Sequence, residues 1–158
     1  MSARGWWIAL AAAAVLLAAG AALSAAALPV KSGHYSGRTS QHRPLTFHSK
    51  ANRRALKGLT IGPEQQRAGG IKIYCSEENR SDYIDTRVSV EGIIPVASTG
   101  RFTVHAHVRG RLQEGDFEMR GRFVTSRRAR GTLRLDSTRY SDHATCSSGR
   151  LTFTARER

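Results

Sequence analysis

The chain has 158 residues and a mass of 17.3 kDa, with 25 Lys and Arg residues against 12 Asp and Glu residues. This length suits one domain with a short additional segment and is too small for a two-domain enzyme. The charged fraction of 23% and the spread of apolar residues in short runs exclude wholesale disorder and a coiled coil. The excess of positive charge predicts attraction to an anionic partner.

The N-terminal segment is typical of an export signal. Arg4 supplies a positive start, no charged residue occurs in Trp6–Leu28, and Ala25–Ala27 forms an A-x-A cleavage site. We therefore expect a signal peptide at 1–27 and a single exported β domain at 28–158. The alternative is an uncleaved membrane anchor at residues 6–28, because a stretch of this length can cross a hydrocarbon core of ~30 Å. Both interpretations place the domain outside the cell or in the cell envelope, and membrane contact is expected only if the segment is uncleaved.

Export makes the two cysteines of the sequence interpretable. In an oxidising compartment, Cys75 and Cys146 are expected to form one disulfide. The bond would close a loop of about 70 residues and, in the chain-entropy model, stabilise the fold by roughly 4 kcal/mol. A metal site at these cysteines is disfavoured because neither belongs to a cluster with ligand spacing.

The exported part consists of short extended segments separated by Gly, Ser, Asn and Pro, and none shows a sustained helical period. In the clearest segment, Arg101–Arg109, apolar and polar residues alternate, as in a strand with one buried face. The same alternation recurs at residues 116–124, 129–135 and 150–156. Less regular candidates lie at residues 34–39, 44–49, 56–61, 71–75 and 84–90. The pattern predicts an all-β fold, either an antiparallel sandwich or a partly closed barrel, with about eight strands.

Several motifs are distributed over most of the exported part. They are the Y-x-G-x-T-x-Q opening at Tyr35, the cysteine pair, G-R-F at Gly100 and Gly121, A-R-G-T-L at Ala129, and C-S-S-G-R-L-T-F-T-A-R at Cys146. In these motifs the chain resembles a widespread group of small exported β-rich proteins of high-GC actinobacteria. The resemblance implies a β fold and an exported location, and it implies no catalytic residues.

Known catalytic patterns are missing from the sequence. It contains no nucleophile elbow, HExxH motif, P-loop or paired-carboxylate arrangement, and no cofactor motif. Cys146 follows His143 closely, but a Cys/His nucleophile would require an unpaired cysteine. We therefore expect a non-enzymatic protein without cofactors, and the alternative is a secreted hydrolase of unrecognised type.

His105 and His107 lie two residues apart on the same strand face and could supply two nitrogens to one metal ion. A third ligand would have to come from another of the six histidines, which the sequence does not place nearby. We expect these residues to be exposed sheet histidines that hold no metal.

The alternation of the last four long strand segments collects arginines on one polar face. After removal of Arg4 the chain has 24 cations against 12 acids, a net charge of +12. If these strands are neighbours, the predicted basic face carries Asp116, Glu118 and the nine arginines Arg101, Arg109, Arg120, Arg122, Arg128, Arg130, Arg134, Arg150 and Arg156. The alternative is that these arginines only solubilise an ordinary polar sheet face.

Anionic cell-wall polymer or lipid headgroups are the expected partners, because phosphates require only charge and fork-shaped donors. Nucleic acid is disfavoured by the exported location. The aromatic residues Phe102, Phe117, Phe123 and Phe153 are also predicted on the apolar face, which leaves the basic face without platforms for base stacking.

Overall fold

The computed structural model describes residues 30–50, 54–62, 69–75, 83–110 and 112–158. The proposed signal peptide or anchor lies outside these residues. Within the described parts of the chain, no helix is long and apolar enough to cross a membrane.

The described residues form one antiparallel sheet of eleven strands. They are β1 (Gly33–Thr39), β2 (Pro44–Lys50), β3 (Ala55–Ile61), β4 (Ile71–Cys75), β5 (Tyr83–Thr86), β6 (Val88–Pro95), β7 (Arg101–Arg109), β8 (Gln113–Thr125), β9 (Arg128–Arg139), β10 (Thr145–Ser147) and β11 (Leu151–Glu157). The all-β prediction is confirmed. Two strands more than the predicted segments are present, because the segment at 84–90 is divided at Arg87 and because β10 precedes β11.

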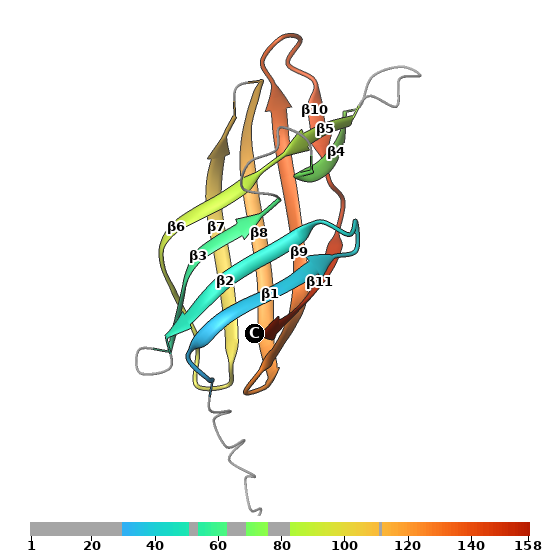
Figure 1. Cartoon of the computed structure of the whole chain (residues 1–158). Coiled ribbons are helices and arrows are strands. Elements are labelled where there is room, and N and C mark those ends of the chain that lie inside the picture. The colour runs from blue at the N-terminus through green and yellow to red at the C-terminus, as the bar shows by residue number, and fades with distance from the viewer. Residues whose placement is uncertain (1–29, 51–53, 63–68, 76–82, 111) are drawn as a thin grey trace, which may run out of the picture.

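The long strand β9 is the branch point of the sheet. It pairs with β8 along its length, with β11 over its first half and with β10 over its second half. From β11 the sheet continues through β1, β2 and β3 to β6, and from β10 it continues through β4 to β5. Because only Arg87 separates β5 from β6, the two branches rejoin and the sheet approaches a closed barrel. Figure 1 shows β1, β2, β3 and β6 crossing in front of β7, β8 and β9.

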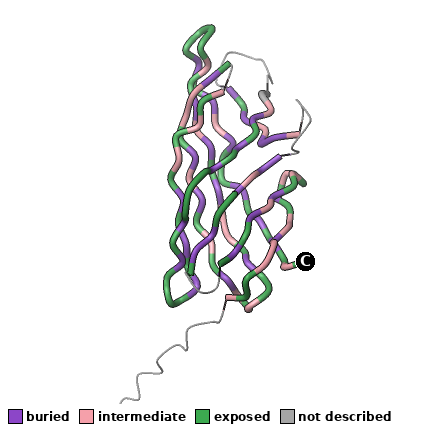
Figure 2. The backbone as a smooth tube through the Cα atoms, turned by 60° about the vertical axis from the view of Figure 1, so that its left-hand side comes forward, coloured by how far each residue is buried: buried purple, intermediate pink, exposed green. Residues whose placement is uncertain are grey.

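The core lies between these two layers, and it is apolar. Buried and exposed residues alternate along the strands, as the tube in Figure 2 shows. Most of the predicted inward residues of the last four long strands are buried, including the four phenylalanines, which are at most 3% exposed. Ala106, Val108 and Gly121 are partly buried. Four aromatic rings, those of Tyr35, Phe47, Phe102 and Phe123, pack together at centroid separations of 5.1 to 6.3 Å. The strand faces predicted from alternation are therefore correct.

A disulfide joins Cys75 and Cys146, as predicted. The two residues are direct partners in the β4–β10 ladder, and their Cα atoms are 3.9 Å apart. The bond ties the short strands β4 and β10 together at one end of the barrel, where the ladder between them has only two residue pairs.

Candidate functional site

Four neighbouring strands, β7, β8, β9 and β11, present one polar face to solvent. The ladder registers align their residues in rows that run across the strands. The first outward row consists of Arg101, Arg122, Arg130 and Thr154, and the second consists of Thr103, Arg120, Thr132 and Thr152. The inward row between them consists of Phe102, Gly121, Gly131 and Phe153.

Gly121 and Gly131 face each other across β8 and β9, and both lack the inward side chain that their positions would otherwise carry. A Cβ atom on Gly121 would lie 2.3 Å from Cζ of Phe102. A Cβ atom on Gly131 would lie 2.7 Å from Cε1 of Phe153 and 2.0 Å from the backbone oxygen of Arg120. Gly121 is therefore required because the ring of Phe102 occupies the space beneath it, and Gly131 because the backbone of Arg120 and the ring of Phe153 leave no space for a side chain.

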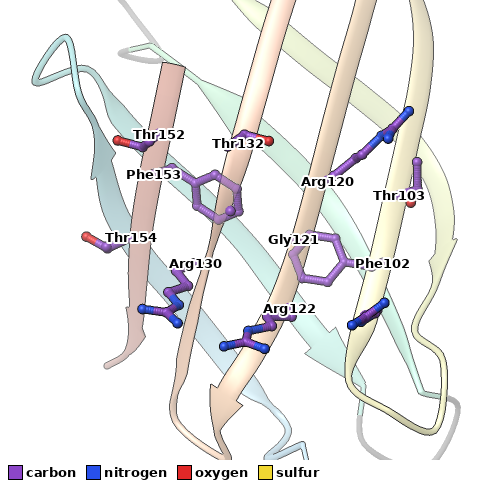
Figure 3. Close-up of a pocket in the computed structure, with 12 residues that line it drawn as sticks. Phe102, Thr103, Arg120, Gly121, Arg122, Arg130, Thr132, Thr152, Phe153 and Thr154 are labelled. Carbon is purple, nitrogen blue, oxygen red and sulfur yellow. The ribbon is translucent and has the colours of Figure 1, made fainter. Parts of the chain in front are cut away.

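An open groove of about 580 Å³ runs over this inward row. The two outward rows form its walls, and the backbone of the inward row forms its floor. Figure 3 shows Arg122, Arg130 and Thr154 on one side of the two phenyl rings and Arg120, Thr132 and Thr152 on the other. The volume is in the range of ligand sites in proteins. All the polar side chains that line the groove are arginines and threonines.

The groove is strongly cationic. Arg101 faces Arg122, and Arg122 faces Arg130, so three guanidinium groups follow one another across three strands. All three side chains are exposed, and none of them forms an ion pair within the described residues. Arg120 is different, because its Nε donates to a carboxylate oxygen of Glu118. Arg101, Arg122 and Arg130 are the cations of the groove that remain available to a ligand.

The other arginines of the predicted basic face have separate surroundings. Arg128 faces Arg156 across β9 and β11, at the end of the face beyond the arginine row. Arg150 lies with Arg120 and Arg134 around a smaller hollow of about 300 Å³. The guanidinium group of Arg109 is 3.4 Å from the carboxylate of Glu114, at the opposite end of the face.

Acidic side chains gather at that opposite end. Besides Asp116 and Glu118, Glu114 and Asp136 also belong to the outward face. Arg134 donates to Asp136 over 2.6 Å, and Ser147 donates to the other oxygen of the same carboxylate over 2.6 Å. Burial raises the pKa of Asp136, but these two hydrogen bonds and the charge of Arg134 together hold it below its usual value. Arg134 is thus held by an internal ion pair. The positive charge of the outward face is compensated at this end and stays uncompensated over the groove.

His105 and His107 lie at the acidic end of the outward face. His107 Nδ1 is 3.2 Å from an oxygen of Asp116, and His105 faces Glu118 across the β7–β8 ladder. Within the described residues, no three His, Cys, Asp or Glu side chains are grouped so that they could hold a metal ion. His34 and His48 contact each other on β1 and β2, in the other layer of the barrel. The expectation that His105 and His107 hold no metal stays a prediction.

Comparisons of the chain with protein-family models, curated proteins and solved structures gave no match. The resemblance to exported actinobacterial proteins therefore stays a prediction, and the site is interpreted from its geometry alone.

Sequence reasoning missed half of the groove. It placed the arginines on the outward face but gave no role to the four threonines, Thr103, Thr132, Thr152 and Thr154, which alternation also places there. It also missed Glu114 and Asp136, because the predicted strand segments 116–124 and 129–135 are shorter than β8 and β9 and leave these two residues out. Extending the alternation by two residues at each strand end would have found both acids.

Proposed function

We propose that this protein is an exported, non-catalytic component of the cell envelope that holds an anionic cell-wall polymer in the groove across β7, β8, β9 and β11. The observation that carries the proposal is the row of Arg101, Arg122 and Arg130. These like charges face one another without an internal counter-charge, an arrangement that disfavours the free protein and favours an anionic ligand. Each guanidinium group can contact a phosphate through two hydrogen bonds and stays charged at physiological pH.

The choice of partner follows from what the groove presents. Its polar side chains are suited to phosphates and hydroxyl groups, whereas the phenyl rings of Phe102 and Phe153 are buried beneath the sheet. A surface without exposed rings lacks the stacking contacts that single-stranded nucleic acid uses. A groove that crosses four strands also accommodates an extended chain better than a flat layer of lipid headgroups. These features support a cell-wall polymer.

A secreted hydrolase is the alternative proposal. Hydrolytic sites place carboxylates or a nucleophile in a protected pocket with perturbed pKa values. Here three carboxylates of the outward face, those of Glu114, Glu118 and Asp136, lie beside arginines, and that of Asp116 lies beside His107. The barrel interior is apolar. This arrangement supports binding over catalysis.

The test compares two triple variants with the same change in net charge. Arg101→Gln, Arg122→Gln and Arg130→Gln alter the groove. Lys50→Gln, Arg54→Gln and Lys57→Gln alter exposed cations on or beside β2 and β3, in the other layer. Retention is measured by co-sedimentation with purified actinobacterial cell wall at about 0.15 M salt.

The groove variant should lose most of its retention, and the control variant should keep it. Walls from which hydrogen fluoride has removed the phosphodiester-linked polymers should retain neither variant nor the parent protein. Equal loss by both variants would show that net charge alone acts and would contradict the proposal. Undiminished binding to stripped walls, or binding only to anionic lipid vesicles, would contradict it as well.

A further inference from the structure

The groove has two chemically different parts. Its arginines come from β7, β8 and β9, whereas the polar side chains that β11 contributes are Thr152 and Thr154. Thr132 on β9 faces Thr152, and Thr103 on β7 lies beside the arginine row. Phosphate charge is therefore attracted toward one end, and hydroxyl groups are concentrated toward the other.

The four threonines are available for binding. Thr103, Thr152 and Thr154 are exposed and Thr132 is half-buried. None of their hydroxyl groups forms a hydrogen bond to another described residue. A threonine hydroxyl both donates and accepts, so it can bind a ligand hydroxyl, which an arginine can only donate to.

The floor of the groove adds no competing polar groups. Gly121 is paired on both sides, with Phe102 and with Gly131, and Gly131 is paired with Gly121 and Phe153. The backbone N–H and C=O groups of strands with two neighbours are used within the ladders. A ligand therefore finds polar partners only on the two walls and finds bare peptide and glycine CH₂ surface between them.

From these observations we infer that the groove selects a polyol-phosphate or sugar-phosphate chain, a phosphodiester polymer whose repeating units carry free hydroxyl groups. The chain lies across the strands, with a phosphate on Arg101, Arg122 and Arg130 and the adjoining hydroxyl-bearing unit against Thr132, Thr152 and Thr154. Neighbouring strands lie ~4.8 Å apart, so four strands span roughly 14 Å, enough for a phosphate and the unit next to it. This inference rests on the proposed function and adds the chemical class of its ligand.

The experiment compares two soluble probes, polyglycerol phosphate, which carries hydroxyl groups, and inorganic polyphosphate, which has none. In one variant the four groove threonines are replaced by valine, which has the same shape and suits a strand. In a second variant they are replaced by serine, which keeps the hydroxyl groups. Affinities are measured by calorimetry, and circular dichroism checks that each variant is folded.

The valine variant should bind polyglycerol phosphate at least tenfold more weakly, as expected for the loss of about two net hydrogen bonds. It should bind polyphosphate within roughly twofold of the parent protein, because the arginines are intact. The serine variant should keep most of the affinity for polyglycerol phosphate. Should the valine variant be misfolded, Thr152→Val with Thr154→Val, at exposed positions on β11, gives the same comparison.

Equal affinities of the valine and parent proteins for polyglycerol phosphate would overturn the inference, and so would an equal loss for both probes. If the valine and parent proteins had equal affinities and both still bound through Arg101, Arg122 and Arg130, the proposed function would stand although the inference failed. If the parent protein bound neither probe, both the inference and the proposed function would fail.

Discussion

Gly121 and Gly131 connect the core to the binding surface. Their missing inward side chains leave space for the phenyl rings of Phe102 and Phe153, and their backbone forms part of the groove floor on the outer face. The same pair of residues therefore permits close packing on the inner face of the sheet and contributes backbone to the groove on the outer face. Their role could be found only from the ladder register, because each glycine alone resembles an ordinary weak position in a strand.

Replacing Gly121 by alanine tests this packing. The added Cβ would lie 2.3 Å from Cζ of Phe102, so we expect the free energy of unfolding to fall by about 1–3 kcal/mol. Phe102→Leu removes the end of the ring, so the double variant should be more stable than the sum of the two single effects predicts. Urea unfolding of the four proteins measures this coupling. Strictly additive effects would show that the ring and the glycine do not compete for space.

Arg122 lies between two like charges and should make the free protein less stable. We predict that Arg122→Gln raises the free energy of unfolding by roughly a few tenths of a kcal/mol at low salt. The gain should disappear near 1 M salt, where the screening length is about 3 Å. Arg38→Gln is the matched control, because Arg38 faces Pro44 and Thr154 and has no charged partner in its ladders. A stabilisation of equal size in the control would assign the effect to net charge.

Tyr35 gives the fold a dependence on alkaline pH. Burial and the charge of Glu157 raise the pKa of Tyr35 to about 12, and its hydroxyl donates to the backbone oxygen of Ser126 over 2.6 Å. In the unfolded chain the same phenol ionises near pH 10. Between these values the folded state binds more protons, so the free energy of unfolding falls as pH rises.

Tyr35→Phe should remove this contribution. The variant should be about 1 kcal/mol less stable than the parent near pH 9, because the hydrogen bond is lost. The difference should shrink above pH 10 and reverse in sign by pH 11.5, because ionisation of the phenol in the unfolded chain lowers the stability of the parent but not that of the variant. Chemical unfolding at the two pH values measures it, and a difference that is constant with pH would refute the account.

At the scale of elements, alternation predicted the strands well because each has one face in the core. It could not predict which residues face each other across β8 and β9. A bulge between Phe123 and Thr125 shifts the register beside the two-residue turn at Ser126 and Arg127. This shift aligns Gly121 with Gly131, so the groove depends on a local irregularity that the alternation does not contain.

The disulfide joins β4 to β10, whose ladder has only two residue pairs. Because the bond closes a loop of 71 residues, we predict that Cys75→Ala with Cys146→Ala lowers the free energy of unfolding by roughly 4 kcal/mol. Thermal unfolding of the variant and of the reduced parent protein should agree. A loss below about 1 kcal/mol would show that the barrel end is held by packing alone.

At the scale of the whole molecule, composition predicted that the protein attracts anions, but it did not predict which part of the surface binds them. The nine arginines expected on one face are all found at exposed positions. Acidic side chains neutralise the end of this face that lies beside the β7–β8 hairpin, where Arg109 contacts Glu114. The charge is therefore concentrated over the groove. The sequence could not reveal this asymmetry because it depends on the exact ends of β8 and β9.

The most direct test of the central claim is to map by NMR which backbone amides respond when polyglycerol phosphate is added to the protein. The account predicts that the largest chemical-shift changes occur in Arg101–Thr103, Arg120–Arg122, Arg130–Thr132 and Thr152–Thr154, and that they weaken as salt rises. Changes centred on β1, β2 and β3, or spread evenly over all exposed cations, would contradict it.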